Sequence, residues 1–299
     1  MKKTKSEKKG VAVVFGGSGF LGSHVADALT STGYRVRIFD SKKSPYLQKG
    51  QEMITSDMLN AAAVAKAVKG ASVIYNFAGI ADLDDAYTKP LETVHLNVIG
   101  NLNVMDAAVK AKVRRYVYAS TIYVYSDKGG FYRCSKQASE LYIEEYHRRY
   151  GLDFTILRYS TLYGPRADQR NSVFRYLKQA RLKKQLNCGG TGDEMREYIH
   201  VYDAAKLSVQ ILSNEFANDH VTISGHHPVK FRDMVSMINE MLGGKVKISY
   251  SKSRHPAHYD YTPYSYAPKI GHKLTHSLYI DMGQGLLESL HDMQARREI

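Results

Sequence analysis

Residues 11–29 read VAVVFGGSGFLGSHVADAL and pass from apolar, β-branched residues through glycines into a helix-forming stretch. Gly16, Gly19 and Gly22 stand at three-residue intervals in this run. Glycines at such a turn let backbone amides and the N-terminus of the next helix approach a pyrophosphate without a Cβ in the way. The stretch therefore predicts a strand, a turn and a helix that together bind a dinucleotide. A purely structural glycine turn is the alternative.

Short β-rich runs alternate with longer helix-like stretches through the first half of the chain. Strands are expected at 11–15, 35–39, 73–77, 115–119 and 154–158, and helices at 21–32, 61–68, 91–109 and 136–149. Alternation of this kind is typical of βαβ units with right-handed crossovers and helices on both faces of one sheet. The fold class is therefore predicted to be α/β, a Rossmann-type doubly wound parallel sheet.

The pattern loosens in the second half, which indicates a smaller C-terminal substrate-binding lobe. We expect residues 10–165, joined by about 200–225, to form the dinucleotide-binding domain. Residues 166–199 and 226–299 would form the lobe, and residues 1–9 (MKKTKSEKK) a disordered basic tail. Ligands of doubly wound sheets bind outside the carboxyl ends of the strands, so the cleft is expected between the two parts.

Composition narrows the class of partner. The 299 residues carry a net charge of +13, which favours anionic ligands, and phosphorylated small molecules fit better than nucleic acid because the basic residues are scattered without a nucleic-acid motif.

No apolar run approaches the roughly 20 residues of a membrane span, and the opening does not resemble a signal peptide. Cys134 and Cys188 lack metal-like spacing and suggest free thiols in a reducing, cytoplasmic compartment, so no metal is expected.

The candidate catalytic residues follow the fourth expected strand, at the carboxyl edge of the sheet. Ser120 and Thr121 directly follow the fourth expected strand, while Tyr132 and Lys136 lie one helical turn apart. A nearby ammonium favours the tyrosinate, so we expect the pKa of Tyr132 to fall below its usual ~10 and Tyr132 to remove a hydroxyl proton as hydride leaves the carbon. The same spacing recurs at Tyr202–Lys206, which we interpret as a coincidence because no such strand precedes it.

Acidic and turn residues after the neighbouring strands add to the cofactor prediction. Asp40 follows the second strand, where a carboxylate accepts hydrogen bonds from a ribose 2′-hydroxyl and repels a 2′-phosphate. That favours NAD over NADP, although Lys42 and Lys43 lie nearby. Asp57 and the NFAG segment at 76–79 would border the dinucleotide, or act only as a cap and a tight turn.

Seven motifs in order carry a family resemblance. They are GGSGFLG, Asp40, NVIGNLNVMDAA (97–108), ASTIYVYS, YRCSK, LRYSTLYGPR (157–166) and REYIHVYDAA (196–205). Together they resemble the extended short-chain dehydrogenase/reductases, specifically the NAD-dependent nucleotide-sugar epimerase/dehydratase group. The resemblance implies a Rossmann fold, tightly held NAD, a nucleotide-diphosphate sugar as substrate in carbohydrate biosynthesis, and a homodimer that pairs through the helices at 91–109 and 136–149.

The resemblance also assigns residues. It makes Thr121, Tyr132 and Lys136 catalytic, with Tyr132 as the base. Around the cofactor it places Gly16, Gly19, Phe20, Leu21, Gly22, Asp40, Asp57, Met58, Phe77, Ala78, Gly79, Asn97, Ser120, Tyr132, Lys136 and Tyr159. Around the substrate it places Thr121, Thr161, Asn171, Arg196 and Arg254. The two arginines would meet the diphosphate, and an ion pair of Arg196 with a neighbouring glutamate is the alternative.

The chain departs from these relatives at three places. Ile122 and Tyr123 replace the Asp–Glu pair that commonly follows the catalytic threonine in members that remove water. Only SDKGGF, residues 126–131, stands where a longer loop helps to cover the sugar, so the pocket is either more open or covered by the tyrosine-rich segment at 259–266. Thr161 stands in place of an asparagine, which leaves the identity of the sugar open.

These departures rank the functions. The leading hypothesis is a nucleotide-sugar epimerase that acts at C4 through a transient 4-keto sugar. A keto-sugar reductase that exchanges NADH in every cycle is the alternative. A 4,6-dehydratase ranks lower, because no carboxylic acid follows Thr121 to protonate the leaving hydroxyl. A non-enzymatic dinucleotide-binding scaffold is the competing hypothesis from another class.

Overall fold

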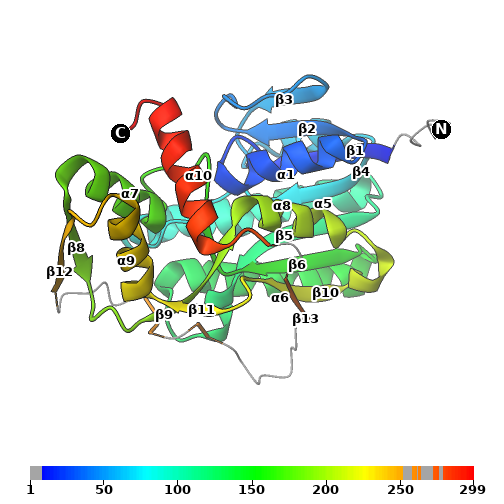
Figure 1. Cartoon of the computed structure of the whole chain (residues 1–299). Helices are drawn as coiled ribbons and strands as arrows, with labels where there is room; N and C mark the ends of the chain where they lie inside the picture. The colour runs from blue at the N-terminus through cyan, green and yellow to red at the C-terminus, as the bar shows by residue number, and fades with distance from the viewer. Residues whose placement is uncertain (1–8, 252–257, 261, 264–271, 276–278) are drawn as a thin grey trace.

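The chain folds around one fully parallel sheet. The computed structural model describes residues 9–251, 258–260, 262–263, 272–275 and 279–299. Eight strands form the main sheet in the order β13-β10-β6-β5-β4-β1-β2-β3 (Figure 1). Their bounds are β1 Lys9–Phe15, β2 Tyr34–Asp40, β3 Gln51–Thr55, β4 Ala71–Asn76, β5 Arg115–Thr121, β6 Phe154–Tyr159, β10 Asp219–Ile223 and β13 His272–Leu274. The prediction of a doubly wound α/β fold is confirmed.

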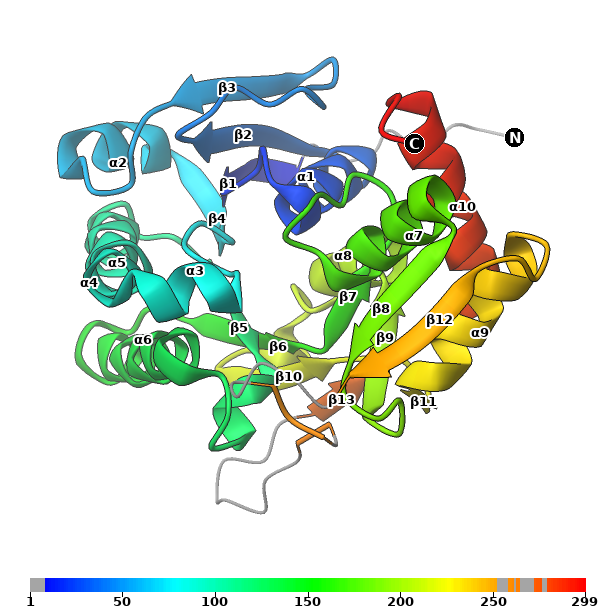
Figure 2. The same ribbon diagram turned by 90° about the vertical axis from the view of Figure 1, so that its left-hand side faces the viewer.

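Both faces of this sheet are covered by helices, as a parallel sheet requires. Val11, Val13 and Phe15 of β1 pack into one buried cluster, whereas Ala12 and Val14 pack into the other. One face carries α1 (Phe20–Ser31) and α8 (Val201–Gln210), and the opposite face carries the helices from α2 to α6 (Figure 2). The latter are α2 Ala61–Val68, α3 Leu83–Thr88, α4 Pro90–Val94, the π-helical segment η1 His95–Gly100, α5 Asn101–Lys110 and α6 Gly130–Tyr150.

A smaller lobe is built from the second half of the chain and has a core of its own. Figure 1 shows α7, α9, β8 and β12 gathered beyond the end of the main sheet. Its strands are β7 Thr161–Tyr163, β8 Gln185–Gly189, β9 Met195–His200, β11 Pro228–Lys230 and β12 Lys247–Ser251. Its helices are α7 Ser172–Lys183, α9 Phe231–Met241 and α10 Met282–Ala295. Two 3-10 turns complete the elements, η2 at Ile122–Tyr125 and η3 at Asn214–Phe216.

The order of the strands fixes where a ligand can bind. Starting from β1, the next strands β2 and β3 are added on one side of it. The later strands β4, β5, β6 and β10 are added in turn on the other side. The reversal between β1 and β4 is the switch point at which loops diverge and leave a crevice at the carboxyl edge. The glycine turn after β1 and the loop after β4 therefore flank the same crevice.

Four expectations from the sequence need correction. β13 lies beside β10 in the main sheet, so residues 226–299 are not confined to the smaller lobe. β1 begins at Lys9, inside the expected tail, whose other residues lie outside the described part of the chain. The single helix expected at 91–109 is α4, η1 and α5 in succession. β3 was not expected as a strand. No helix in the described ranges is long and apolar enough to cross a membrane.

Candidate active site

The turn between β1 and α1 is too tight to admit side chains. Gly16 has a φ of +74°, and a Cβ there would lie 2.7 Å from the backbone nitrogen of Ala78. A Cβ on Gly22 would clash with the carbonyl oxygen of Gly16. Gly19 caps α1 without a side-chain hydrogen bond, and the first turn holds no acidic residue. The amides at this helix N-terminus are therefore open to an anion, which fits the pyrophosphate of NAD.

Asp40 lies against this turn, as its position after β2 predicts. Its carboxylate accepts the N–H of Ser18 at 3.0 Å and the N–H of Lys42 at 3.0 Å. The acidic group is thus fixed beside the glycine turn and half-exposed. The geometry fits an adenosine ribose with a free 2′-hydroxyl.

Asn97 joins the loop after β4 to the helix that carries the candidate catalytic residues. Its side-chain amide donates to the carbonyl of Ile80 and to Ser135 Oγ, both at 2.9 Å, and its Oδ1 accepts the N–H of Ile80 at 2.7 Å. A Cβ on Gly79 would clash with Asn97 Oδ1. Asn97 sits in the π-helical segment, a deviation often found at functional sites. The expected cofactor residues after β4 are therefore held close to α6.

Other expected cofactor residues occupy more structural positions. Asp57 accepts the N–H of Leu59 at 2.8 Å and so closes a local turn. Met58 is buried against Gly100, where a Cβ would lie 2.7 Å from Met58 Cγ. The hydroxyl of Tyr159 is 2.6 Å from Ser208 Oγ on α8, inside the core. Phe20 and Leu21 begin α1, and Phe77 stacks on Tyr75 with ring centroids 5.9 Å apart.

Thr121, Tyr132 and Lys136 come together at the carboxyl edge of β5. Thr121 ends β5, and the other two lie one turn apart near the start of α6. Lys136 Nζ donates to the carbonyl oxygen of Ala119 at 2.7 Å and lies 5.8 Å from the centre of the Tyr132 ring. The Thr121 side chain lies close enough to Tyr132 to act on the pKa of its phenol. A phenol, an alcohol and an amine thus face one edge of the sheet.

The expected lowering of the Tyr132 pKa is wrong. Burial raises the pKa of Tyr132 to about 12, against the smaller opposite effect of the hydrogen bond with Thr121. Burial also lowers the pKa of Lys136 to about 8, although Glu140 acts to raise it. The sequence pattern places the ammonium near the phenol, but it does not show that both groups are desolvated together, nor that Lys136 donates to Ala119.

Behind these residues lies a buried ion pair that the sequence reading missed. Arg158 contacts Glu140 through two hydrogen bonds of 3.1 and 2.7 Å, and Ser120 Oγ donates to the same carboxylate at 2.5 Å. Burial is the largest effect and acts to lower the pKa of Arg158, but Glu140 and Tyr125 together outweigh it and raise the pKa. The signal was present in the sequence, because Tyr132, Lys136 and Glu140 recur at four-residue spacing on one face of α6.

Besides Thr121 on β5, three of the expected substrate residues, Thr161, Asn171 and Arg196, lie in the smaller lobe. Arg196 on β9 donates to the carbonyl oxygen of Tyr259 at 3.0 Å, and its guanidinium lies 4.5 Å from the centre of that ring. Thr161 is half-buried in β7. Asn171 caps α7 by accepting the N–H of Phe174 at 3.1 Å and donates to the carbonyl of Leu162 at 2.7 Å. Arg254 lies outside the described residues.

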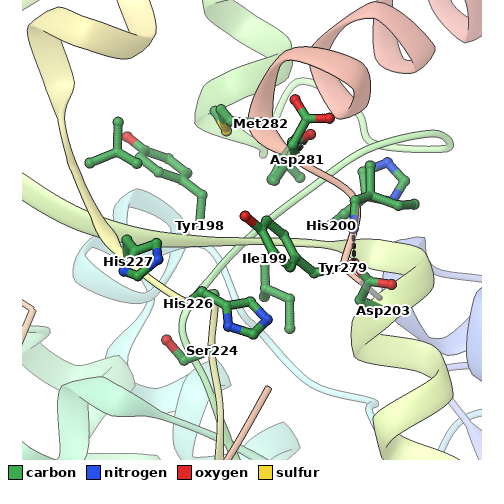
Figure 3. A pocket seen from close by; sticks show the side chains of 14 residues that line it. Tyr198, Ile199, His200, Asp203, Ser224, His226, His227, Tyr279, Asp281 and Met282 are labelled. Atoms are coloured by element: carbon green, nitrogen blue, oxygen red, sulfur yellow. Dashed lines mark hydrogen bonds between the residues drawn. The ribbon is translucent and has the colours of Figure 1, made fainter. Parts of the chain in front are cut away.

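A separate cavity of about 190 Å³ opens between β9, α8 and the start of α10 (Figure 3). The rings of His226 and Tyr279 pack against each other at its wall, tilted by 41° and with centroids 4.2 Å apart. Asp203 accepts the N–H of Ile280 at 2.8 Å, and burial lowers the pKa of His200 to about 4. None of the expected catalytic or ligand-binding residues lines this cavity. It is therefore distinct from the candidate active site.

The second Tyr-x-x-x-Lys copy behaves as expected of a coincidence. Tyr202 and Lys206 both lie on the exposed side of α8. The Tyr202 ring packs edge-on against His24 and His200, with centroids 5.1 and 4.9 Å away.

No candidate metal site is found among the described residues. In that part of the chain, no three His, Cys, Asp or Glu side chains gather in a way that could hold a metal ion.

Comparisons with known proteins agree with this architecture. A family model described as "NAD dependent epimerase/dehydratase family" matches residues 12–224. The UDP-glucuronate 4-epimerase of Thermodesulfobacterium geofontis is 25% identical over 272 residues, which cover 81% of this chain and 83% of that protein. The UDP-N-acetyl-α-D-glucosaminuronate decarboxylase of Bacillus cytotoxicus is 25% identical over 262 residues, 79% of this chain and 81% of that protein.

Solved structures support the same fold. The crystal structure of UDP-glucose 4-epimerase from Thermotoga maritima, determined with UDP-glucose, superposes with a TM-score of 0.85 at 21% identity. The superposition covers 96% of this chain and 99% of that one. The likeness extends over the main sheet and the smaller lobe together.

Proposed function

The chain belongs to the NAD dependent epimerase/dehydratase family, and we propose that it is a nucleotide-sugar 4-epimerase that works through tightly bound NAD and a transient 4-keto sugar. The observation that carries the proposal is the convergence of Thr121, Tyr132 and Lys136 at the carboxyl edge of β5, the same edge of the parallel sheet at which the glycine turn follows β1. A base and a hydroxyl-binding group next to a dinucleotide cradle are what removal of a proton and a hydride from one alcohol carbon requires.

The residues of the chain divide the work between them. Tyr132 would take the proton from the sugar 4-hydroxyl, and Thr121 would hold the same oxygen. Lys136 would stabilise the tyrosinate, since its ammonium lies 5.8 Å from the ring. The chemistry that NAD would supply at this site is reversible acceptance of the C4 hydride, with the 4-keto sugar turning in the pocket between the two transfers. Gly16, Gly19 and Gly22 would cradle its pyrophosphate, and Asp40 would bind its ribose.

The smaller lobe would bind the nucleotide diphosphate of the substrate. Arg196 would meet the diphosphate, a position suited to a forked and permanently charged donor. UDP is proposed as the nucleotide, because the T. geofontis and B. cytotoxicus relatives are both named for UDP-sugars. The positive charge of the chain, +13, agrees with a dianionic diphosphate.

Incubation of the purified protein with both 4-epimers of UDP-glucose and of UDP-glucuronate tests the proposal. Chromatographic separation should show conversion in both directions without added cofactor. Tyr132→Phe should abolish conversion and retain NAD. The matched control is Tyr202→Phe, which removes the same atom from the second Tyr-x-x-x-Lys copy and should leave activity unchanged. Absence of conversion for both sugars, with NAD bound, would count against an epimerase.

The competing reactions give different readouts in the same experiment. A keto-sugar reductase would consume free NADH, visible as a loss of absorbance at 340 nm. A dehydratase would release water and form a 4-keto-6-deoxy product. Ile122 is buried and Tyr123 carries only a phenol, so neither supplies a carboxylic acid after Thr121. That observation ranks elimination below epimerisation.

We infer further that two copies pair through α4, η1, α5 and α6. These helices lie side by side on one outer face of the molecule (Figure 2). Large apolar side chains are exposed on them, where a solvated surface would carry charge: Leu91, Val94, Ile99, Leu141 and Tyr142. Leu91 is 76% exposed. Exposed apolar side chains gathered on neighbouring helices are typical of a protein–protein interface.

A further inference from the structure

The ring of Tyr118 on β5 lies against the ammonium group of Lys136. Lys136 Nζ is 4.6 Å from the centre of the Tyr118 ring, closer than the 5.8 Å to the centre of the Tyr132 ring. Both distances are within the roughly 6 Å at which the face of an aromatic ring attracts a cation. Tyr118 is 1% exposed and Lys136 is 5% exposed. The contact is therefore shielded from water, which is the setting in which a cation–π attraction is strongest.

The alternation of side chains along β5 explains why this ring meets α6. Tyr116 and Tyr118 pack into the buried cluster on the face of the sheet that α6 covers, whereas Val117 packs into the cluster on the opposite face (Figure 2). The backbone of the next residue, Ala119, supplies the carbonyl oxygen that accepts a hydrogen bond from Lys136 Nζ at 2.7 Å. One short stretch of β5 thus gives the ammonium group both a ring face and a hydrogen-bond acceptor.

The other titratable groups near Lys136 give its charge little direct support. Glu140 lies one turn further along α6 and acts to raise the pKa of Lys136, but its carboxylate already binds Arg158 through two hydrogen bonds. Tyr118 and Tyr132 are neutral phenols, because burial raises the pKa of each. An ammonium group has three donors, and in the described part of the chain one of them, toward β5, has a hydrogen-bond acceptor. The face of the Tyr118 ring is therefore a main contact of the charge.

From this geometry we infer that Tyr118 is a positioning residue for Lys136, and that the face of its ring keeps the ammonium group charged and beside Tyr132. The inference rests on the proposed function, in which the charge on Lys136 stabilises the tyrosinate. The negative face of an aromatic ring attracts the ammonium form and not the neutral amine. Burial acts in the opposite direction and favours the neutral amine. The ring therefore offsets part of what burial costs the charge.

An uncharged support suits the work proposed for Lys136. A carboxylate at the position of the Tyr118 ring would also keep the ammonium group charged. Its own negative charge, however, would cancel much of the effect of the ammonium on the phenol of Tyr132 and would disfavour the tyrosinate. A ring face stabilises the cation without adding a charge. The field of the ammonium group therefore stays available to the base.

Fluorinated phenylalanines at position 118 test the inference with little change in the shape of the ring. Each fluorine withdraws electrons from the ring face and weakens its attraction for a cation. Tyr118→Phe is the reference, and mono-, di- and trifluorophenylalanine are compared with it, using whichever of UDP-glucose and UDP-glucuronate the wild type converts. We expect the alkaline limb of the kcat profile, where Lys136 loses its proton, to move to lower pH by about one pH unit over the series. KM should change less than about twofold, because the ring is buried and leaves substrate binding intact.

Tyr116 provides the matched control. Its ring is buried on the same face of β5, two residues away, whereas Lys136 lies over the rings of Tyr118 and Tyr132. The same fluorinated series at position 116, with Tyr116→Phe as its reference, should leave the alkaline limb in place. A limb that moves equally in both series would report a general disturbance of the core and would overturn the inference. A limb that stays fixed in the series at position 118 would overturn it too.

A second readout needs no substrate. The free energy of unfolding of each protein in the series at position 118 is compared, across pH, with that of the same protein carrying Lys136→Met. The unfolded chain holds the lysine proton up to about pH 10.5, so the difference begins to rise where the folded chain loses that proton. This onset should move to lower pH with each fluorine, and a fixed onset would overturn the inference. Failure of the wild type to convert any UDP-sugar would instead overturn the proposed function, so the two failures are distinguishable.

Discussion

The ammonium nitrogen of Lys136 lies 5.8 Å from the centre of the Tyr132 ring, at the carboxyl edge of β5. Lys136 is buried and Tyr132 is half-buried, and desolvation moves their pKa values in opposite directions, to about 12 for Tyr132 and about 8 for Lys136. At neutral pH Tyr132 is therefore neutral, whereas Lys136 is still mostly protonated and loses its charge near pH 8. Because the pKa of buried Lys136 differs between the folded and the unfolded chain, the free energy of unfolding must depend on pH.

The difference in the free energy of unfolding between the wild type and Lys136→Met should therefore change with pH. Between pH 8 and 10.5 the unfolded chain holds a proton on Lys136 that the folded chain has lost, so the contribution to the free energy of unfolding rises with pH in that window. Relative to Lys136→Met, the wild type should gain about 2 kcal/mol from pH 7.5 to 10. Urea unfolding of both proteins at each pH measures the difference. A gap that stays constant would contradict the lowered pKa.

The Glu140–Arg158 pair predicts a second, larger effect. Its side chains are only 6% and 3% exposed, so removal of one partner leaves a buried charge without compensation. Glu140→Gln should lower the free energy of unfolding by about 3 kcal/mol. It should also lower the pKa of Lys136 further, because Glu140 acts to raise it.

A double-mutant cycle separates the pair from the rest of its surroundings. Glu140→Leu, Arg158→Leu and the double variant are compared with the wild type by urea unfolding. The double variant should lose at least 1 kcal/mol less than the sum of the single losses, because neither charge is left alone in the core. Additive losses would mean that the two side chains do not stabilise each other.

Much of the fold could be predicted from the sequence because its local and global signals agree. The glycine turn, the apolar strands on both sides of it and the alternation with helices all indicate one parallel sheet. The expected helix at 61–68 coincides with α2. The strand β3 was missed because its residues, QEMIT, mix charge with a single β-branched apolar residue at an edge of the sheet.

Contacts between distant segments set the limit of the sequence reading. β13 is three residues long and becomes a strand only because β10 offers an open edge. The approach of His258 to Tyr123 depends on the path of a segment anchored to β9, which no local pattern encodes. The prediction of a lowered pKa for Tyr132 failed for the same reason, since burial is set by tertiary packing rather than by spacing along α6.

The glycine turn yields a third prediction with a matched control. Gly16 and Gly70 have nearly the same φ, +74° and +73°, but a Cβ at Gly16 meets the backbone of Phe77 and Ala78, whereas a Cβ at Gly70 meets nothing within 4 Å. Gly70→Ala should cost about 1 kcal/mol through φ alone. Gly16→Ala should cost clearly more and abolish NAD retention. Thermal unfolding and the cofactor content of the purified proteins measure the two effects, and equal losses would argue against a cradle built by close backbone approach.

The exposed apolar face on α4 and α6 yields the last prediction. Leu91 and Leu141 are 76% and 56% exposed, and a carboxylate at each position would be buried without a partner in a dimer of the proposed kind. Leu91→Asp combined with Leu141→Asp should therefore convert a species of twice 33.7 kDa into one of 33.7 kDa in sedimentation velocity at micromolar concentration. Leu182→Asp is the control, because that side chain is 57% exposed on α7 in the smaller lobe and should leave the mass unchanged. A wild type that sediments as a single chain, or a dimer that survives the double substitution, would place the interface elsewhere or remove it.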